Sequence, residues 1–296
     1  MPRVLLPIAG LLVMGAGWGA NLMLAKFAVG AGAAPFGLAF TEALGSGLLL
    51  LLVCLFRKLP DLSRRHLLFY LVSGATGITI PNVLMFHVAR YLPVGVLSLL
   101  LTLVPLATYA LSLLLRVERF AWIRAAGLLV GLIAVGLIVA PAGSLPAPGL
   151  AGWVLLGFGA TAMFAVQNVY VARAWPADSD ALALSCGGLI VGGLLLLPVT
   201  VATDAMISLT PPWGIVQWAV ATMLAVNAVL TVIFTDLIRR VGPVVTSQTA
   251  YLITIAGVLW GIALFHERHS LWIWTAMLLM CLGVALVSRR SRAASA

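Results

Sequence analysis

Charged side chains are scarce in this sequence. They make up 8% of its residues, whereas an ordinary soluble domain carries about 25%. Hydrophobic residues account for 63%. Because so few charges cannot cover a surface exposed to water, a soluble globular protein is excluded, and lipid is the solvent for most of the chain.

Cysteine is also rare, with three in 296 residues. Cys54, Cys186 and Cys281 all lie in apolar segments and show no CxxC or Cys/His spacing. An odd number of isolated cysteines predicts packing residues rather than disulfides or a metal site. The sequence contains no phosphate-binding loop and no catalytic triad, so we expect no cofactor, no metal and no enzymatic activity.

Acidic residues are outnumbered, with eight Asp and Glu against seventeen Lys and Arg, for a formal charge of +9. A nucleic-acid partner is nevertheless not expected, because the basic residues lie between apolar segments and not along one amphipathic face. The expected partners are membrane lipid and a small-molecule substrate. The oligomeric state is left open.

Long hydrophobic runs are what the sequence has in abundance. A helix needs about 20 apolar residues to cross the hydrocarbon core, and the period-two alternation of barrel strands is absent. We therefore predict an all-α integral membrane fold of ten transmembrane helices, the first retained and not cleaved as a signal peptide. The expected spans are 4–29, 35–56, 67–90, 94–115, 122–140, 151–174, 181–199, 214–238, 243–264 and 271–288.

Lysine and arginine are distributed unevenly between the two sides of such a bundle. With ten helices and a cytoplasmic N-terminus, fourteen of the seventeen lie inside, and only Lys26, Arg90 and Arg268 lie outside. The positive-inside rule then predicts a multi-pass protein of the inner membrane with both termini cytoplasmic.

The two halves of the chain resemble each other. Arg90 to Val94 opens the fourth helix, and Arg240 to Val244 opens the ninth helix 150 residues later. Asn21 in the first helix has a counterpart in Asn168 of the sixth, at an offset of 147. Glu118 and Glu267, 149 residues apart, each lie just before the start of an expected helix. A carboxylate at that position interacts favourably with the positive end of the helix dipole.

These landmarks predict two related five-helix units, residues 1–145 and 146–296. Because each unit has an odd number of helices, the second must be inserted upside down. Inverted repeats of this kind place a substrate site near the midplane and support alternating access.

The motifs RYLPVGVLSLL at 90–100, RRVGPVVTSQT at 239–249 and GWGAN at 17–21 resemble those of the drug/metabolite transporter superfamily, in its EamA-like branch. The resemblance covers nearly the whole chain. It implies ten helices in two inverted repeats, and export or exchange of amino acids or other small metabolites. The sequence departs from the family where Glu42 replaces a common arginine, and where the ninth helix lacks a central proline.

Glu42 is the most informative single residue, because a carboxylate well inside a span costs about 2.5–3.5 kcal/mol on insertion scales. A structural ion pair with Lys26 of the neighbouring helix is one expectation. The other is that Glu42 binds a substrate amine or carries a coupling proton, which makes protons a candidate partner.

Polar and aromatic residues within the expected spans are the other candidates for substrate binding. Trp18 and Asn21 are three residues apart and share one helix face, where packing and a cavity wall are both open interpretations. Amides within a span either bridge helices or line a wet cavity. The predicted substrate-binding residues are Trp18, Asn21, Glu42, Asn82, Tyr109, Gln167, Asn168, Asn227, Tyr251 and Trp260.

Two prolines lie inside expected helices, Pro81 in the third and Pro105 in the fourth. A proline inside a helix produces a bend, and these bends serve either as hinges for a gate or as static kinks. Gly127 and Gly131 form a GxxxG packing motif in the fifth helix, within the protein or at a dimer face. His87, His266 and His269 are expected at the membrane interface.

The sequence therefore favours a secondary transporter that moves a small metabolite, with amino acids or similar solutes as the expected cargo. The alternative is a membrane-embedded lipid-modifying enzyme, which would need a cluster of reactive groups near the headgroups. A channel is less favoured, because it would be expected to show a filter-like ring of repeated positions, which one chain with two inverted halves does not suggest.

Overall fold

The computed structural model describes residues 2–116, 120–139 and 149–288. Glu118, the C-terminal arginines and the predicted boundary at 145/146 lie outside the described residues. Within those residues every regular element is a helix. The elements are α1 (Pro2–Gly30), α2 (Pro35–Cys54), α3 (Arg64–Gly74), η1 (Ala75–Thr79), α4 (Ile80–Val88), α5 (Val94–Leu101), α6 (Val104–Leu114), α7 (Trp122–Val139), α8 (Ala151–Ala174), α9 (Ala181–Ala202), α10 (Ile215–Val241), α11 (Pro243–Ser247), α12 (Thr249–Phe265) and α13 (Leu271–Ser288).

These elements follow the predicted segments closely, because long apolar runs leave the backbone no alternative to internal hydrogen bonding. Eight helical segments are long and apolar enough to cross a membrane. The described parts of α7 and α13 contribute two shorter apolar stretches, Trp122–Ala134 and Leu271–Gly283. The all-helical membrane class is confirmed, while the number of ten crossings stays a prediction.

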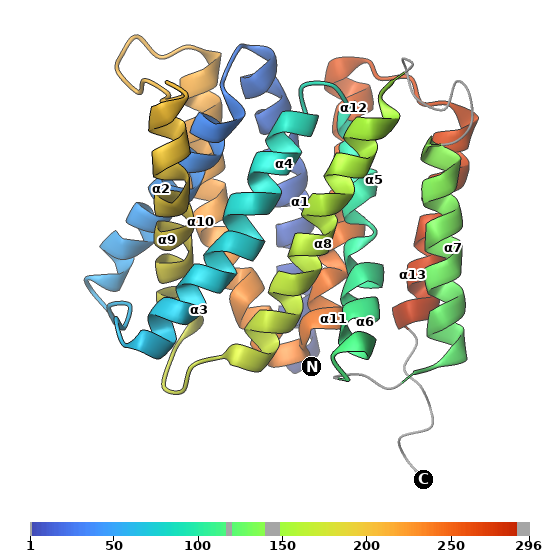
Figure 1. The fold of residues 1–296 in the computed structure, drawn as a ribbon, viewed down its shortest axis with the longest axis horizontal. Coiled ribbons are helices and arrows are strands. Elements are labelled where there is room, and N and C mark those ends of the chain that lie inside the picture. The colour runs from blue at the N-terminus through green and yellow to red at the C-terminus, as the bar shows by residue number, and fades with distance from the viewer. Residues whose placement is uncertain (1, 117–119, 140–148, 289–296) are drawn as a thin grey trace.

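The helices run side by side as an upright bundle (Figure 1). The connections at 55–63 and 175–180, the start of α1 and the end of α13 all lie at the lower end of this view. We call this the basic end, because the segments there carry Arg57, Lys58, Arg173 and Arg239. The connections at 31–34, 203–214 and 266–270 lie at the opposite end (Figure 1).

Glycines allow the helices to approach closely. A Cβ on Gly193 of α9 would lie 2.8 Å from the backbone nitrogen of Leu44 in α2. A Cβ on Gly283 of α13 would lie 2.8 Å from the carbonyl oxygen of Gly127 in α7 and 3.2 Å from the nitrogen of Gly131. The GxxxG motif of α7 therefore packs within the protein, against α13.

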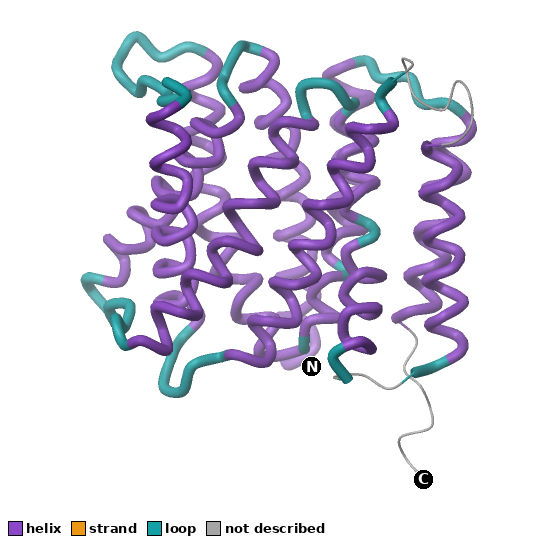
Figure 2. The backbone as a smooth tube through the Cα atoms, in the orientation of Figure 1, coloured by secondary structure: helices purple, strands orange, loops and turns teal. Residues whose placement is uncertain are grey.

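Three helical segments are interrupted. A π-helical turn, η1, precedes Pro81 in the third segment, and Pro105 follows the break between α5 and α6. Figure 2 shows the second break as a short loop within a helical column. The ninth segment is also broken, between α11 and α12 at Gln248, although no proline lies there. The prolines do interrupt their helices as expected, because each lacks an N–H, whereas a hinge function for them stays a prediction.

Candidate functional site

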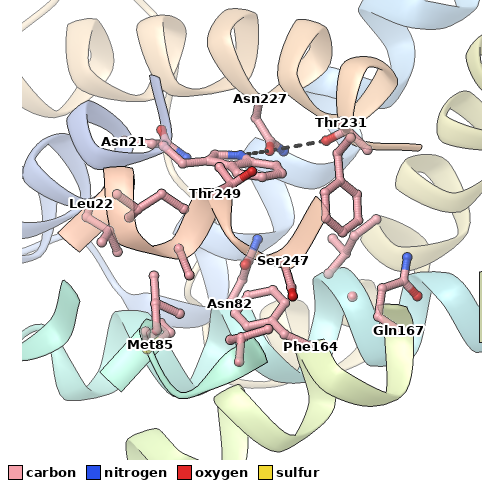
Figure 3. A pocket seen from close by; sticks show the side chains of 18 of the residues that line it. Asn21, Leu22, Asn82, Met85, Phe164, Gln167, Asn227, Thr231, Ser247 and Thr249 are labelled. Atoms are coloured by element: carbon pink, nitrogen blue, oxygen red, sulfur yellow. Dashed lines mark hydrogen bonds between the residues drawn. The ribbon is translucent and has the colours of Figure 1, made fainter. Parts of the chain in front are cut away.

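A cavity lies inside the bundle, between α1, α2, α4, α8, α10 and the α11–α12 segment (Figure 3). The volume open to the centres of water molecules is about 160 Å³. One buried water requires roughly 10–15 Å³ by this measure, so the cavity has room for a small solute. Seven of the ten predicted binding residues line it: Trp18, Asn21, Glu42, Asn82, Gln167, Asn168 and Asn227.

The α1 and α10 helices form one wall of the cavity through residues spaced by one helical turn. The Trp18 indole Nε1 donates a hydrogen bond to Asn227 Oδ1 at 3.4 Å. The Thr231 hydroxyl donates to the same oxygen at 3.3 Å, and both bonds are drawn in Figure 3. Asn227 thus bridges two helices and also lines the cavity, so both predicted roles of a mid-membrane amide meet in one residue.

Glu42 is buried, with 1% of its surface exposed. Its Oε1 accepts a hydrogen bond from Asn21 Nδ2 at 2.6 Å. The predicted ion pair with Lys26 is wrong, because the Lys26 ammonium donates instead to the carbonyl oxygens of Ala89 at 2.7 Å and Leu92 at 2.8 Å. The α1 helix presents Asn21 and not Lys26 toward the Glu42 carboxylate.

Three oxygens of cavity-lining residues are buried without a hydrogen-bond donor: Glu42 Oε2, Asn21 Oδ1 and Asn168 Oδ1. Buried polar atoms in proteins are almost always paired, so unpaired acceptors at a cavity call for a donor from outside the chain. Among the described residues that line the cavity, Glu42 is the one with a formally charged side chain, and the others are amides, hydroxyls or apolar groups.

Three of the predicted binding residues lie away from the cavity lining. The Tyr109 hydroxyl accepts a hydrogen bond from the Ala121 backbone N–H at 3.2 Å, and the Arg124 guanidinium lies 5.2 Å from its ring centroid. Trp260 is 37% exposed on the outside of the bundle. Tyr251 packs against the hydrophobic core beside the cavity. The contacts of these three rings are with other neighbours than the cavity.

The sequence did not point to several hydroxyl and aromatic residues that line the cavity. Thr246, Ser247 and Thr249 come from the break between α11 and α12, and Phe164 and Phe234 from α8 and α10. The signal for the first group was weak, because the Thr246 and Ser247 hydroxyls bond to nearby carbonyls of their own segment, as such residues do in any helix. A run of small hydroxyl residues beside Gln248 was the available clue.

A second, smaller cavity of about 20 Å³ adjoins the first. The two share Ile78, Gln167 and Thr231 as lining residues. The lining of the second also includes Phe69 and Leu184, which lie close to the starts of α3 and α9 at the basic end. The space inside the bundle therefore continues toward the basic end.

Side chains tie the opposite end together. Glu267, in the connection between α12 and α13, accepts hydrogen bonds from the backbone N–H groups of Val94 at 2.6 Å and Gly95 at 3.0 Å. The expectation that Glu267 interacts with the start of the helix that follows it is wrong, because its carboxylate caps the start of α5. The turn at His266, with φ of 52°, carries the chain from α12 back across the start of α5.

His269 lies within the same cluster at this end of the bundle, and its side chain is 2% exposed, so it packs inside the protein, while its depth at the membrane interface stays a prediction. Its Nε2 lies 3.4 Å from Glu267 Oε2. Burial lowers the pKa of His269, while the nearby Glu267 carboxylate acts in the opposite direction. Lys26 of α1 donates hydrogen bonds to the connection at 89–93, so α1 also takes part in the contacts that close this end of the bundle.

A bundle of apolar helices around an internal cavity with a few polar side chains defines an integral membrane protein with room for a small solute. The sequence model of the EamA-like transporter family matches residues 5–140 and again residues 151–289. The chain therefore belongs to the EamA-like transporter family, as the motif resemblance predicted.

Two curated proteins are similar in sequence. The chain is 27% identical to "Uncharacterized transporter YvbV" of Bacillus subtilis (strain 168), over 99% of this chain and 94% of that protein. It is 29% identical to "Protein PecM" of Dickeya dadantii (strain 3937), over 58% of this chain and 56% of that protein. The names of the family and of YvbV are those of transporters rather than enzymes.

A solved structure titled "Crystal structure of protein" has the same fold. It superposes with a TM-score of 0.62 and covers 95% of this chain and 96% of its own, at 20% sequence identity. At this identity the likeness shows the fold alone.

Proposed function

We propose that this protein is a secondary transporter that moves a small metabolite across the inner membrane by alternating access, with export of amino acids or similar small solutes as the expected activity. The observation that carries the proposal is the internal cavity, which is lined by Glu42 and five amides among apolar side chains, inside an apolar bundle of a transporter family. Buried amides and a carboxylate are costly in a membrane protein, and a solute pathway accounts for them.

The packing of the helices supports two repeats with a two-fold relation. The first helix of one half, α1, packs on α10 and α12, and the first helix of the other half, α8, packs on α4 and α6. Three further pairs join corresponding elements: α2 with α9, α5 with α12, and α7 with α13. Exchange of the halves maps this pattern onto itself, which supports units at 1–145 and 146–296 in inverted orientation.

The charge distribution supports a cytoplasmic location for the basic end. The connections and helix starts at that end hold most of the lysines and arginines, and short loops rich in these residues stay on the cytoplasmic side. The cluster of Lys26, Glu267 and His269 then closes the outer side. The smaller cavity extends toward the basic end and has room for about one or two water molecules.

Counterflow into proteoliposomes tests the proposal. Vesicles containing the purified protein are loaded with a panel of unlabelled amino acids, amines and related metabolites, and uptake of each labelled compound is measured against protein-free vesicles. We expect saturable uptake of at least one compound that depends on the same compound inside. Folded, inserted protein that gives no counterflow for any panel member would contradict the amino-acid-like cargo.

A further inference from the structure

Two unpaired acceptor atoms lie together at the meeting of α1 and α2. The hydrogen bond between Asn21 and Glu42 uses one atom of each side chain, Nδ2 and Oε1. It leaves Asn21 Oδ1 and Glu42 Oε2 buried without a donor, in residues that line the cavity. A ligand that fills this place must bring hydrogen-bond donors.

We propose that the cavity binds its substrate through a protonated amino group held by Glu42 and Asn21, and that it offers no ion pair to a carboxylate. An organic ammonium ion is then bound better than the zwitterion or the anion with the same apolar body, so within the proposed range of small solutes the site favours amines over amino acids. The inference concerns binding, and it rests on the proposed transport function only for the identity of the ligand as cargo.

A cation stabilises the ionised form of the Glu42 carboxylate more than a neutral donor does. An ionised carboxylate in a low-dielectric interior is costly without a positive partner, and the neutral amide of Asn21 supplies only a hydrogen bond. The nearest candidate in the sequence, Lys26, is occupied by two backbone carbonyls. An ammonium group has three N–H donors and no acceptor, which matches a site made of two free oxygens.

The walls next to this site suit an apolar or aromatic substituent. Trp18 and Leu22 share the face of α1 that carries Asn21, and Met85 and Phe86 line the cavity from α4. An indole face also attracts a cation, because the negative face of its ring quadrupole favours positive charge. The substrate class is therefore an amine with a compact hydrophobic body.

A carboxylate finds no matching charge in the same cavity. Among the described lining residues there is no lysine, arginine or histidine. Outside the Glu42 site the polar groups are neutral amides and hydroxyls, including Asn82, Gln167 and Ser247. A zwitterion would have to leave its carboxylate without an ion pair, beside the negative charge of Glu42.

Equilibrium binding to the purified full-length protein tests this selectivity. The probe is tritiated 2-phenylethylamine, with phenylalanine and 3-phenylpropionate as competitors that keep the phenethyl body and change only the charged groups. We expect saturable binding of the amine, at least tenfold weaker competition by phenylalanine, and weaker competition still by 3-phenylpropionate. Equal or better competition by either carboxylate, or no binding of the amine to folded protein, would overturn the proposal.

Substitutions then assign the amine to its site. We expect Glu42→Gln, which keeps the shape and removes the charge, to weaken binding of 2-phenylethylamine at least tenfold. Asp236→Asn is the matched control, because Asp236 pairs with Arg240 at the surface of the basic end. Asn21→Ala provides a second variant should Glu42→Gln fail to fold, with an expected loss of several-fold. Unchanged amine affinity in both folded cavity variants would overturn the assignment.

The binding and transport measurements can contradict the two proposals independently of each other. Amine binding that depends on Glu42 without any counterflow would retain the site and contradict the transporter. Counterflow of an anion with no amine binding would retain the transporter and contradict the ammonium site.

Discussion

Trp18 and Trp260 illustrate how one residue type can have two roles in the same bundle. The Trp18 indole donates to Asn227 and lines the cavity, whereas Trp260 is 37% exposed on the outer surface of α12. Both tryptophans lie within expected transmembrane spans of the sequence, and the contacts of each ring distinguish them.

A matched pair of substitutions checks this distinction. Trp18→Leu removes the hydrogen bond to Asn227 and the ring surface of the cavity, so we expect apparent substrate affinity in counterflow to fall about tenfold, equivalent to about 1.4 kcal/mol. Trp260→Leu should leave affinity within about twofold of wild type. Equal effects of the two substitutions would contradict the assignment of Trp18 to the cavity wall.

His269 makes the stability of the closed opposite end depend on pH. Its buried ring has a pKa below the ordinary 6.5, so the folded protein binds fewer protons there than the unfolded chain. The stabilisation is fully present above pH 6.5 and is lost as pH falls through the interval between 6.5 and the lowered value. We expect the temperature of the unfolding midpoint in detergent to be lower at pH 5.5 than at pH 7.5.

Two histidine variants isolate this contribution. His269→Gln should reduce the fall in unfolding temperature over that pH range. His266→Asn serves as the control, since His266 is exposed and asparagine tolerates its positive φ of 52°. A pH dependence that is the same in His269→Gln and wild type would refute the role of His269.

At the scale of helices, close packing is set by small residues at a few crossing points. Gly193 of α9 lies against the backbone of Leu44 in α2, whereas a Cβ on Gly152, near the start of α8, would meet no atom within 4 Å. The same chemical change at these two positions therefore has opposite expected effects.

Gly193→Ala and Gly152→Ala test the α2–α9 contact. The first adds a methyl group 2.8 Å from the Leu44 nitrogen, and overpacking of this kind costs about 1–3 kcal/mol. The second should be neutral or stabilising by up to about 1 kcal/mol, because alanine is the better helix former. Unfolding midpoints in detergent compare the two, and equal midpoints would contradict the close approach.

At the scale of the whole molecule, the segregation of basic residues to one end defines a testable topology. We expect a single cysteine at Lys58→Cys, in the connection at the basic end, to resist a membrane-impermeant thiol reagent in intact cells. A cysteine at Ser208→Cys, in the connection at the opposite end, should react. Both substitutions are made in a protein whose three native cysteines are replaced by serine. The reverse pattern would invert the proposed orientation.

Much of this architecture could be predicted from local patterns. Hydropathy is a property of consecutive residues, so the membrane class and the positions of the helical segments were determined by the sequence itself. The same holds for polar residues at mid-depth, which is why Trp18, Asn21, Glu42 and Asn227 were predicted before their neighbours were known. The interruptions at Pro81 and Pro105 follow from the missing proline N–H.

Only the tertiary structure decided which of these groups meet. Glu42 bonds to Asn21 and not to Lys26, and Glu267 caps α5 and not the helix that follows it. Such pairings depend on the rotation of each helix about its axis and on where distant segments cross. In this chain those quantities are set by close contacts at glycines and by breaks such as the one at Gln248, which carry little signal in a linear sequence of apolar residues.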